Sequence, residues 1–445
     1  MAKYRFILGI MAGIMVFTAA GCKAESTVET NVSQSTEKEN VENTDVQKGA
    51  GGERRVVTIW YDGTEEESVK RLEPEFETLH PDIDLQFEVV PYSDLSTKEM
   101  VACQSEVGPD IMWQSYAWTN SFAKMGLLTS YTPYLEKSEA IDLANDFDPV
   151  ALELGTVDGE IYGLPWSMEA MCLVYNKDMF REAGLDPEKP PTNWEEVIEY
   201  SQKLTIDRDG DGTIDQYGYG LVGNLTGNTW FRFVPELWSA GGEVANADMT
   251  EGTLNSEQAI EAMTYYTDLL NKYHVAPEGS VNNGAAEVRT LFNNKNVAMY
   301  IDGQPAVKNI QKDAPDIDVG VALWPGKDGT LNAGLGGYYI ATPKNAANPD
   351  DAWTFIEYFL SEEVQEYFPI SFPANLKARD TERFQDSISQ IFAEQLTHTK
   401  NFQPLPDTPG AQQIILDAVQ SVMTGMSTPQ EAMEQANESL NGTLK

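Results

Sequence analysis

The chain has 445 residues, of which 41% are hydrophobic and 10% aromatic, and this length suits roughly two or three domains with buried cores. Asp and Glu number 70 against 30 Lys and Arg, a formal net charge of −40. This charge excludes a broad nucleic-acid-binding surface, because such a surface would repel the phosphate backbone. With only three cysteines and three histidines, a disulfide framework is excluded and no local histidine pair is available for a metal.

The first 53 residues are predicted to be a targeting segment and a tether. Lys3 and Arg5 precede an uncharged apolar run over 6–20, which is too short to span a membrane as a helix. Small residues then lead directly to Cys22, which resembles a bacterial lipoprotein signal: residues 1–21 are removed and the Cys22 thiol is acylated. The alternative is an ordinary secretory signal with an incidental cysteine. Residues 22–53 are polar and contain no aromatic, Leu or Ile, which predicts a disordered tether.

From residue 54 to 445, predicted strands and helices alternate as they do in layered α/β lobes. The body begins with a strand over 56–61, a helix over 65–78 that contains Pro74, and a strand over 84–90. Further strands are predicted at 108–113, 161–164, 171–175, 216–220, 297–301, 319–323 and 338–341. Further helices are predicted at 194–204, 256–273, 349–367, 411–423 and 428–440.

Seven short sequence blocks occur between about residues 55 and 375. They are PDI at 109–111, MGLL at 125–128, YGLPW at 162–166, LVYNKD at 173–178, PTNWEE at 191–196, AMYIDG at 298–303 and AWTFI at 352–356. In this order they resemble the extracellular solute-binding proteins of the carbohydrate-binding class that includes the maltose-binding protein. The resemblance implies an α/β, two-lobed periplasmic-binding-protein type II fold with a hinge and a ligand cleft between the lobes.

On this resemblance, each lobe contains two separate stretches of the chain. We expect an N-terminal lobe of residues 54–168 plus about 320–362, and a C-terminal lobe of residues 169–319 plus about 363–445. The crossings between the lobes are then expected near 166–172, 318–320 and 362–368.

A sugar offers apolar C–H faces and a rim of hydroxyls, so a carbohydrate cleft needs aromatic faces and planar polar groups. The family often places a carboxylate on the sugar at the first crossing and stacking aromatics on a loop that matches 228–231. The candidate ligand-binding residues are Asp62, Gln114, Tyr116, Trp118, Glu169, Trp230, Phe231, Asp302, Tyr338 and Phe372. Asp302, Tyr338 and Phe372 are matched to the family only by the segment in which each lies. A turn or capping role is the alternative for Asp62 and Gln114.

An acidic loop follows the helix predicted at 194–204. Carboxylates at positions 1, 3, 5 and 9, with glycine at position 6, match the calcium-loop pattern, and the residue at position 7 would offer its carbonyl oxygen. The predicted metal ligands are Asp207, Asp209, Asp211, Thr213 and Asp215. Gly218 stands at position 12, where the pattern has a bidentate Glu. A structural Ca²⁺ is therefore expected, with a solvated acidic turn as the alternative.

The expected function is that of a lipid-anchored binding protein that captures a carbohydrate and delivers it to the permease subunits of an ABC importer. We expect a monomer on the extracellular face of the bacterial cell membrane, with the lipid anchor as its only membrane contact, no nucleic-acid partner and no required cofactor. Cys103 and Cys172 are expected to be small buried thiols. The alternative is a secreted glycoside hydrolase with Asp62 and Glu169 as its paired carboxylates. The nucleophile elbow, the His-Glu-x-x-His motif and the phosphate-binding glycine loop of other enzymes are absent, which favours binding without catalysis.

Overall fold

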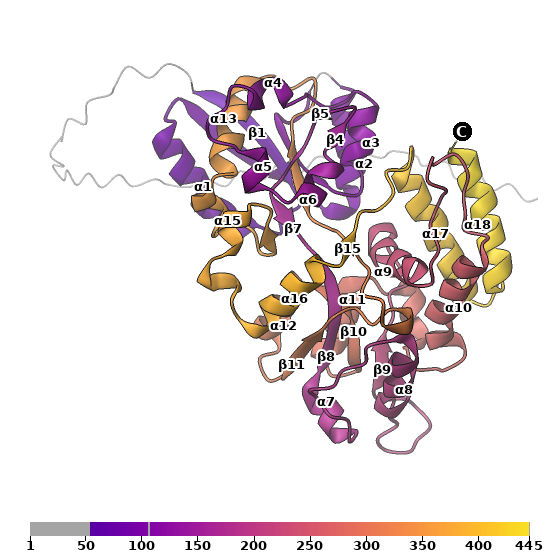
Figure 1. The fold of residues 1–445 in the computed structure, drawn as a ribbon. Helices are drawn as coiled ribbons and strands as arrows, with labels where there is room; N and C mark the ends of the chain where they lie inside the picture. The colour runs from indigo at the N-terminus through magenta and orange to yellow at the C-terminus, as the bar shows by residue number, and fades with distance from the viewer. Residues whose placement is uncertain (1–53, 106, 445) are drawn as a thin grey trace, which may run out of the picture. The chain divides into compact units, whose positions relative to one another are not determined.

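The computed structural model describes residues 54–105 and 107–444 (Figure 1). The predicted signal segment, the acylated Cys22 and the predicted tether lie outside the described residues. Among the residues that are described, none of the helices combines the length and the apolar character needed to cross a membrane.

The first of two large sheets forms the centre of the N-terminal lobe. Its order is β2-β1-β3-β13-β6, in which β1 is parallel to β2 and β3, and β13 is antiparallel to both of its neighbours. Val57, Ile59 and Tyr61 alternate into the core because successive strand residues point to opposite faces. The strands are β1 (Arg55–Tyr61), β2 (Ile83–Val89), β3 (Ile111–Ser115), β6 (Leu164–Pro165) and β13 (Tyr338–Ala341), and α1 (Glu66–Leu79) and α13 (Pro349–Phe359) share their core.

The second sheet forms the centre of the C-terminal lobe, with the order β11-β8-β10-β9. Residues of β8 alternate between two cores, as expected for a strand that is covered on both faces. Leu173 and Tyr175 pack with one group of helices, and Cys172 and Val174 pack with another. The strands are β8 (Met171–Asn176), β9 (Tyr217–Gly220), β10 (Val297–Gly303) and β11 (Val319–Ala322). The first group of helices is α8 (Trp194–Leu204), α9 (Thr226–Ser239), α10 (Glu257–Asn271), α17 (Thr408–Met423) and α18 (Pro429–Thr443), and the second is α11 (Ala285–Asn293), α12 (Gln304–Asp313) and α16 (Ser387–Leu396).

The remaining elements connect or cover these layers. They are α2 (Tyr92–Cys103), α3 (Thr119–Lys124), α4 (Thr132–Leu135), α5 (Leu143–Asp146), α6 (Pro149–Glu153), β4 (Thr156–Val157), β5 (Glu160–Ile161), β7 (Ser167–Met168), α7 (Lys177–Glu182), η1 (Glu278–Asn282), η2 (Lys327–Gly329), β12 (Ala333–Gly334), α14 (Glu362–Gln365), β14 (Phe372–Pro373), α15 (Leu376–Arg379), η3 (Glu382–Phe384) and β15 (Thr399–Lys400). Cys103 and Cys172 are buried free thiols.

The second crossing between the lobes differs from the one predicted near 318–320. Strand β11 pairs with β8 through Ala322, so it belongs to the C-terminal lobe, and the chain joins the first sheet again only at β13. The prediction placed the return too early, because an apolar strand at 319–323 fits either sheet equally well as a sequence pattern.

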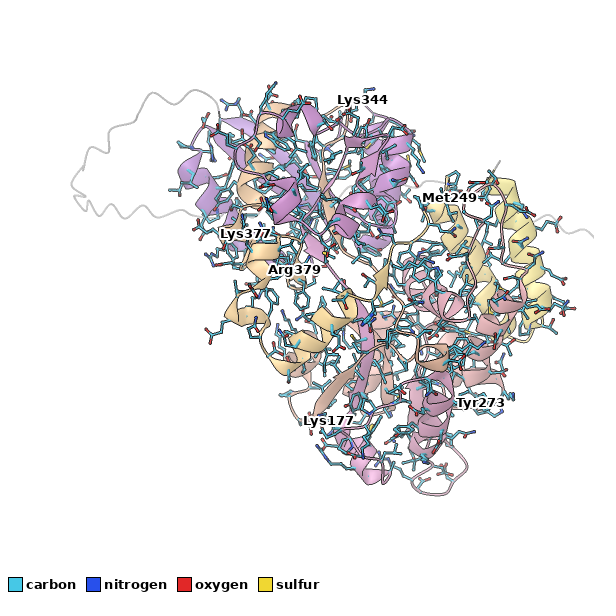
Figure 2. All side chains as sticks on the ribbon, viewed as in Figure 1. Lys177, Met249, Tyr273, Lys344, Lys377 and Arg379 are labelled. Atoms are coloured by element: carbon cyan, nitrogen blue, oxygen red, sulfur yellow. The ribbon has the colours of Figure 1, made fainter. Side chains whose placement is uncertain are left out.

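The third crossing also differs from the prediction of 362–368. Val364, Phe368 and Ala374 all pack in the core of the N-terminal lobe. Lys377 of α15 forms an ion pair with Asp146 of α5, with Nζ 2.8 Å from Oδ1, and Figure 2 labels Lys377 beside this lobe. The chain therefore reaches the second sheet at α16, which packs on β8 and β11. The outer limits predicted for the two lobes stay predictions.

Candidate functional site

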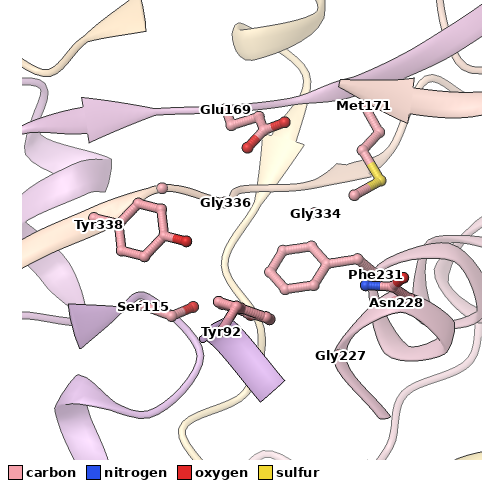
Figure 3. Close-up of a pocket in the computed structure, with 11 residues that line it drawn as sticks. Tyr92, Ser115, Glu169, Met171, Gly227, Asn228, Phe231, Gly334, Gly336 and Tyr338 are labelled. Carbon is pink, nitrogen blue, oxygen red and sulfur yellow. The ribbon is translucent and has the colours of Figure 1, made fainter. Parts of the chain in front are cut away.

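A cavity of about 160 Å³ lies between the two lobes and is lined by residues from both (Figure 3). Three predicted ligand-binding residues, Glu169, Phe231 and Tyr338, line it. The other lining residues are Tyr92, Ser115, Met171, Gly227, Asn228, Gly334, Gly336 and Gly337.

Glu169 lies where the chain passes from the first sheet to the second, and the backbone holds it on both sides. The Glu169 N–H donates to the Gly336 carbonyl at 2.9 Å, and the Gly336 N–H donates to the Glu169 carbonyl at 2.8 Å. Its side chain lies against Gly303, where a Cβ atom would come within 1.8 Å of Glu169 Oε1. The carboxylate position therefore depends on a glycine at residue 303.

The electrostatic surroundings of Glu169 favour its neutral form. Burial and, after it, the nearby carboxylate of Asp302 raise the pKa of Glu169 to about 7. The Arg232 guanidinium acts in the opposite direction, and Asp62 adds to the increase. Near neutral pH, this side chain can therefore accept or donate hydrogen bonds according to the ligand that is present.

Tyr338 forms one wall of the cavity, and Asp62 determines where its hydroxyl points. Tyr338 Oη donates to Asp62 Oδ2 at 2.5 Å, and its ring stacks on Trp166 with centroids 5.5 Å apart and planes 18° apart. Burial and the Asp62 carboxylate hold the pKa of Tyr338 well above its usual value, so the hydroxyl remains protonated. Asp62 also accepts from the Thr64 N–H at 2.9 Å, which is the turn role that the sequence left open. Asp62 thus acts on the cavity through Tyr338.

Two further aromatic rings, those of Tyr92 and Phe231, give the cavity flat apolar faces. Tyr92 is the first residue of α2, and its ring lies 5.7 Å from that of Trp118. The Phe231 ring meets Phe402 edge to face at 4.6 Å, and its Cε1 atom lies close to Gly336. Figure 3 shows Glu169, Tyr338, Phe231 and Tyr92 around one shared space. Flat rings of this kind stack on apolar ligand faces.

Helix α9 brings Gly227, Asn228 and Phe231 to the cavity from its first turns. Residues 228–231 therefore lie in a helix, and the prediction of a loop there is wrong. Asn228 and Gly227 precede Phe231 by three and four residues, and residues at these spacings lie on the same face of a helix. Stacking aromatics in a solute site can therefore come from a helix end.

Arg232 anchors α9 to strand β10. Its Nε donates to the Ile301 carbonyl at 3.0 Å, its Nη1 to the Asn228 carbonyl at 3.1 Å and its Nη2 to Asp302 Oδ1 at 3.2 Å. Asp302 is buried beside this guanidinium and does not line the cavity, although the sequence analysis included it. Its role in the structure is to hold the helix that carries Phe231.

Three candidates, Gln114 in β3 and Tyr116 and Trp118 after it, do not line the cavity. Gln114 Nε2 and Trp118 Nε1 both donate to the buried carboxylate of Glu99, at 3.4 and 3.0 Å. The ring of Tyr116 stacks on that of Tyr339 with centroids 4.2 Å apart, and it is fully covered in the core. Ser115 lines the cavity instead, because neighbouring residues of an extended segment point in opposite directions.

Trp230 and Phe372 also lie outside the cavity. Trp230 has an exposed fraction of 0% and packs against Phe402 at 5.6 Å in the core of the C-terminal lobe. Phe372 stacks on Phe384 at 4.9 Å, close to the third crossing. Both were selected from the sequence as aromatic residues, and a large apolar ring fits a core as well as a ligand site.

Several residues that line the cavity were not predicted from the sequence. Tyr92 and Met171 begin a helix and a strand, and nothing else in the sequence pattern marks them as ligand-binding residues. Asn228 lies in the segment that was chosen for its aromatic residues. Gly336 and Gly337 gave a signal that could have been used. Gly337 has a φ of 131°, and a Cβ atom there would lie 2.2 Å from the Ser167 carbonyl oxygen. Such a paired glycine in a strand segment indicates close approach of another backbone.

The acidic loop brings three of its predicted metal ligands together. One oxygen each from Asp207, Asp209 and Asp215 lies within 4.8 Å of the others, and Asp211 is outside this group. Asp207 accepts from the N–H groups of Gly210 and Gly212 at 2.8 and 2.9 Å, and these bonds hold the pKa of Asp207 below its usual value. The loop thus keeps Asp207 ionised, and the Ca²⁺, with its five ligands including Thr213, stays a prediction.

Two α/β lobes that enclose an aromatic cavity between them define a ligand-binding protein of the periplasmic type II class. Residues 62–366 match the family of bacterial extracellular solute-binding proteins, and the chain belongs to that family. The predicted fold is confirmed. Because the family and its structural relatives are solute-binding proteins, the chain is a binding protein and not an enzyme, and the hydrolase alternative is set aside.

Individual relatives are similar over most of the chain. A binding protein of Brucella abortus is 25% identical over 404 residues, which cover 88% of this chain and 94% of the relative. The maltotriose-binding protein of Pyrococcus abyssi is 27% identical over 311 residues, which cover 68% of this chain and 62% of the relative. An ABC transporter solute-binding protein from Thermotoga lettingae, solved with bound α-D-tagatose, is 29% identical with a TM-score of 0.80, and the match covers 88% of this chain and 100% of that chain.

Proposed function

We propose that this protein captures a carbohydrate in the cavity between its lobes, as the substrate-binding protein of an ABC sugar importer. The observation that carries the proposal is the combination of three aromatic side chains, Tyr92, Phe231 and Tyr338, with the carboxylate of Glu169 around one cavity. Rings bind the C–H faces of a sugar, and a carboxylate accepts bonds from its hydroxyls. The maltotriose-binding and tagatose-bound relatives support the same ligand class.

Ligand capture would close the lobes around the sugar. Residues from both lobes line the cavity, so a ligand that contacts both gains more from the closed arrangement than from the open one. Hinge closure of this kind is known for periplasmic binding proteins. The closed protein would then dock on the permease subunits of the importer.

The membrane anchor is proposed from the sequence. The small residues that precede Cys22 and the polar stretch over 22–53 support acylation of Cys22 and a position on the outer face of the cell membrane. Mass spectrometry of the protein from a membrane fraction should find a lipid on Cys22, and Cys22→Ser should move the protein to the soluble fraction. A Cys22→Ser protein that stays in the membrane fraction would contradict the anchor.

The binding function is tested by thermal unfolding of the Cys22→Ser chain, from residue 22 on, with a panel of neutral mono- and oligosaccharides. A ligand at 100 times its Kd adds about 2.7 kcal/mol to the free energy of unfolding, which raises Tm by several degrees. We expect such a rise with one group of related sugars and no hydrolysis product by chromatography. No rise with any sugar would contradict the proposal.

A further inference from the structure

The charges around the cavity are unbalanced. Glu169 lines it, and Asp62 lies directly behind Tyr338. Within residues 54–105 and 107–444, neither carboxylate forms an ion pair, and no Lys or Arg is among the lining residues. Asp302 is neutralised by Arg232.

Arg232 does not line the cavity, and its hydrogen bonds are made within the C-terminal lobe. Its Nε, Nη1 and Nη2 all donate to acceptors of the C-terminal lobe, namely two backbone carbonyls and the Asp302 carboxylate. The side chain is 4% exposed, so this guanidinium is a fixed part of the lobe. The cavity therefore presents one carboxyl group, that of Glu169, with Asp62 behind Tyr338, and no Lys or Arg among its lining residues.

The aromatic side chains add to this preference. The faces of Tyr92, Phe231 and Tyr338 border the same space as the Glu169 carboxylate (Figure 3). An aromatic face attracts a cation through its quadrupole, and it does so more strongly when water is excluded. Burial raises the pKa of Tyr92 to about 12, so the Tyr92 hydroxyl stays neutral and adds no negative charge.

We propose that the preferred ligand is a sugar that carries a protonated amine, with the ammonium group held between the Glu169 carboxylate and the rings of Tyr92 and Phe231. This inference rests on the proposed function, because it specifies the class of carbohydrate that enters the same cavity. A phosphorylated or otherwise anionic sugar meets Glu169 and Asp62 without a compensating cation, so the cavity disfavours it.

Binding of an ammonium group should be coupled to proton release. The charged or titratable groups that face Glu169 are Asp302 of β10, Arg232 of α9, Asp62 after β1, Tyr92 of α2 and Tyr338 of β13. The pKa of Glu169 is about 7 in the free protein, so part of the population holds a proton there. A bound cation favours the ionised carboxylate, and that proton leaves for the solvent.

The test compares matched sugars by isothermal titration calorimetry at pH 7 with the Cys22→Ser chain. Glucose, galactose and mannose are each compared with their 2-amino-2-deoxy, 6-amino-6-deoxy, N-acetylated 2-amino and 6-phosphate forms. We expect at least one free-amine form to bind 10-fold or more tightly than its parent and its N-acetyl form, and the phosphate to bind most weakly. Titration in two buffers of different ionisation enthalpy should show proton release with the amine only.

Glu169→Gln removes the charge but keeps a planar polar group, and it should reduce the advantage of the amine over its parent to less than threefold. Glu434→Gln makes the same change in net charge on the exposed face of α18 and should preserve the 10-fold advantage. A parent or N-acetyl sugar that binds as tightly as the amine would overturn this inference and leave the proposed function standing. Failure of every sugar, charged or neutral, would overturn both.

Discussion

Trp230 and Phe231 are adjacent aromatic residues with opposite surroundings. The Phe231 ring lies in the cavity, and Trp230 is covered on all sides in the core of the C-terminal lobe. Consecutive residues of a helix point about 100° apart, so the two large rings of this pair have different surroundings. The sequence predicted that this pair mattered, but it could not select the member that faces the ligand.

Phe231→Ala should weaken sugar binding by about 10- to 100-fold, because a ring of this size contributes roughly 1.5–3 kcal/mol when a partner covers it. Calorimetry with the best sugar of the panel measures the loss. The Tm of the free protein should change little, since Phe231 is only partly buried. Trp230→Ala is the matched comparison and should show the reverse, a large drop in Tm from a core cavity that costs about 3–5 kcal/mol. Equal effects of the two substitutions on affinity would contradict the assignment.

Gly303→Ala should weaken binding without touching the ligand. The added methyl group would lie within 1.8 Å of Glu169 Oε1, so the carboxylate must move. We expect at least a 10-fold rise in Kd. Gly279→Ala is the control, because a Cβ atom there meets no other atom within 4 Å, and it should bind as the parent chain does. Unchanged binding by Gly303→Ala would show that the position of Glu169 is unimportant.

The bounds of helices and strands were predicted from the sequence more accurately than the contacts that their residues make. The strands β1, β8 and β10 and the helices α8 and α10 lie within a few residues of their predicted bounds, because apolar periodicity and capping residues are local signals. The helix predicted over 349–367 is divided into α13 and α14 near Leu360, and α9 was taken for a loop. Which residue of a strand faces the cavity depends on partner strands far along the chain, and a local pattern does not contain that information.

The acidic loop between α8 and β9 gives a prediction at the same scale. If Ca²⁺ binds Asp207, Asp209 and Asp215, added Ca²⁺ should raise Tm and a chelator should reverse the rise, because a ligand that binds only the folded state stabilises it. Asp209→Asn should abolish the effect of Ca²⁺. Asp248→Asn makes the same change in an exposed turn and should retain it. A Tm that is independent of Ca²⁺ would favour the solvated acidic turn.

Across the whole molecule, buried carboxyl groups make stability depend on pH. Burial raises the pKa of Glu65, Glu99 and Glu236 to about 8 each, and that of Glu169 to about 7. The same groups titrate near their ordinary value of about 4.3 in the unfolded chain. Between these values the folded protein holds protons that the unfolded chain has released, so stability is lost as pH rises from about 5 to about 8.

We therefore expect the highest Tm near pH 5 and a steady decrease toward pH 8. Glu236→Gln should make the decrease shallower, because it removes one buried ionisation while its amide oxygen still accepts the Trp194 Nε1 bond, which is 2.6 Å long in the parent. Glu434→Gln should leave the slope unchanged, since this side chain is exposed. Scanning calorimetry at four pH values makes the comparison. A Tm that rises over this range would contradict the assignment of these four carboxyl groups.

The pairing of β3 with β13 has a consequence for how the chain reaches its native state. Ser115 pairs with Tyr338, so roughly 220 further residues must be synthesised before the edge of β3 can be covered, which takes on the order of 10–40 s at about 5–20 residues per second. During that interval the first three strands present an open apolar edge, which invites pairing with other chains. Slower synthesis should therefore lower the yield of soluble protein through association at this edge, and a chaperone that covers the edge until β13 is made should restore it.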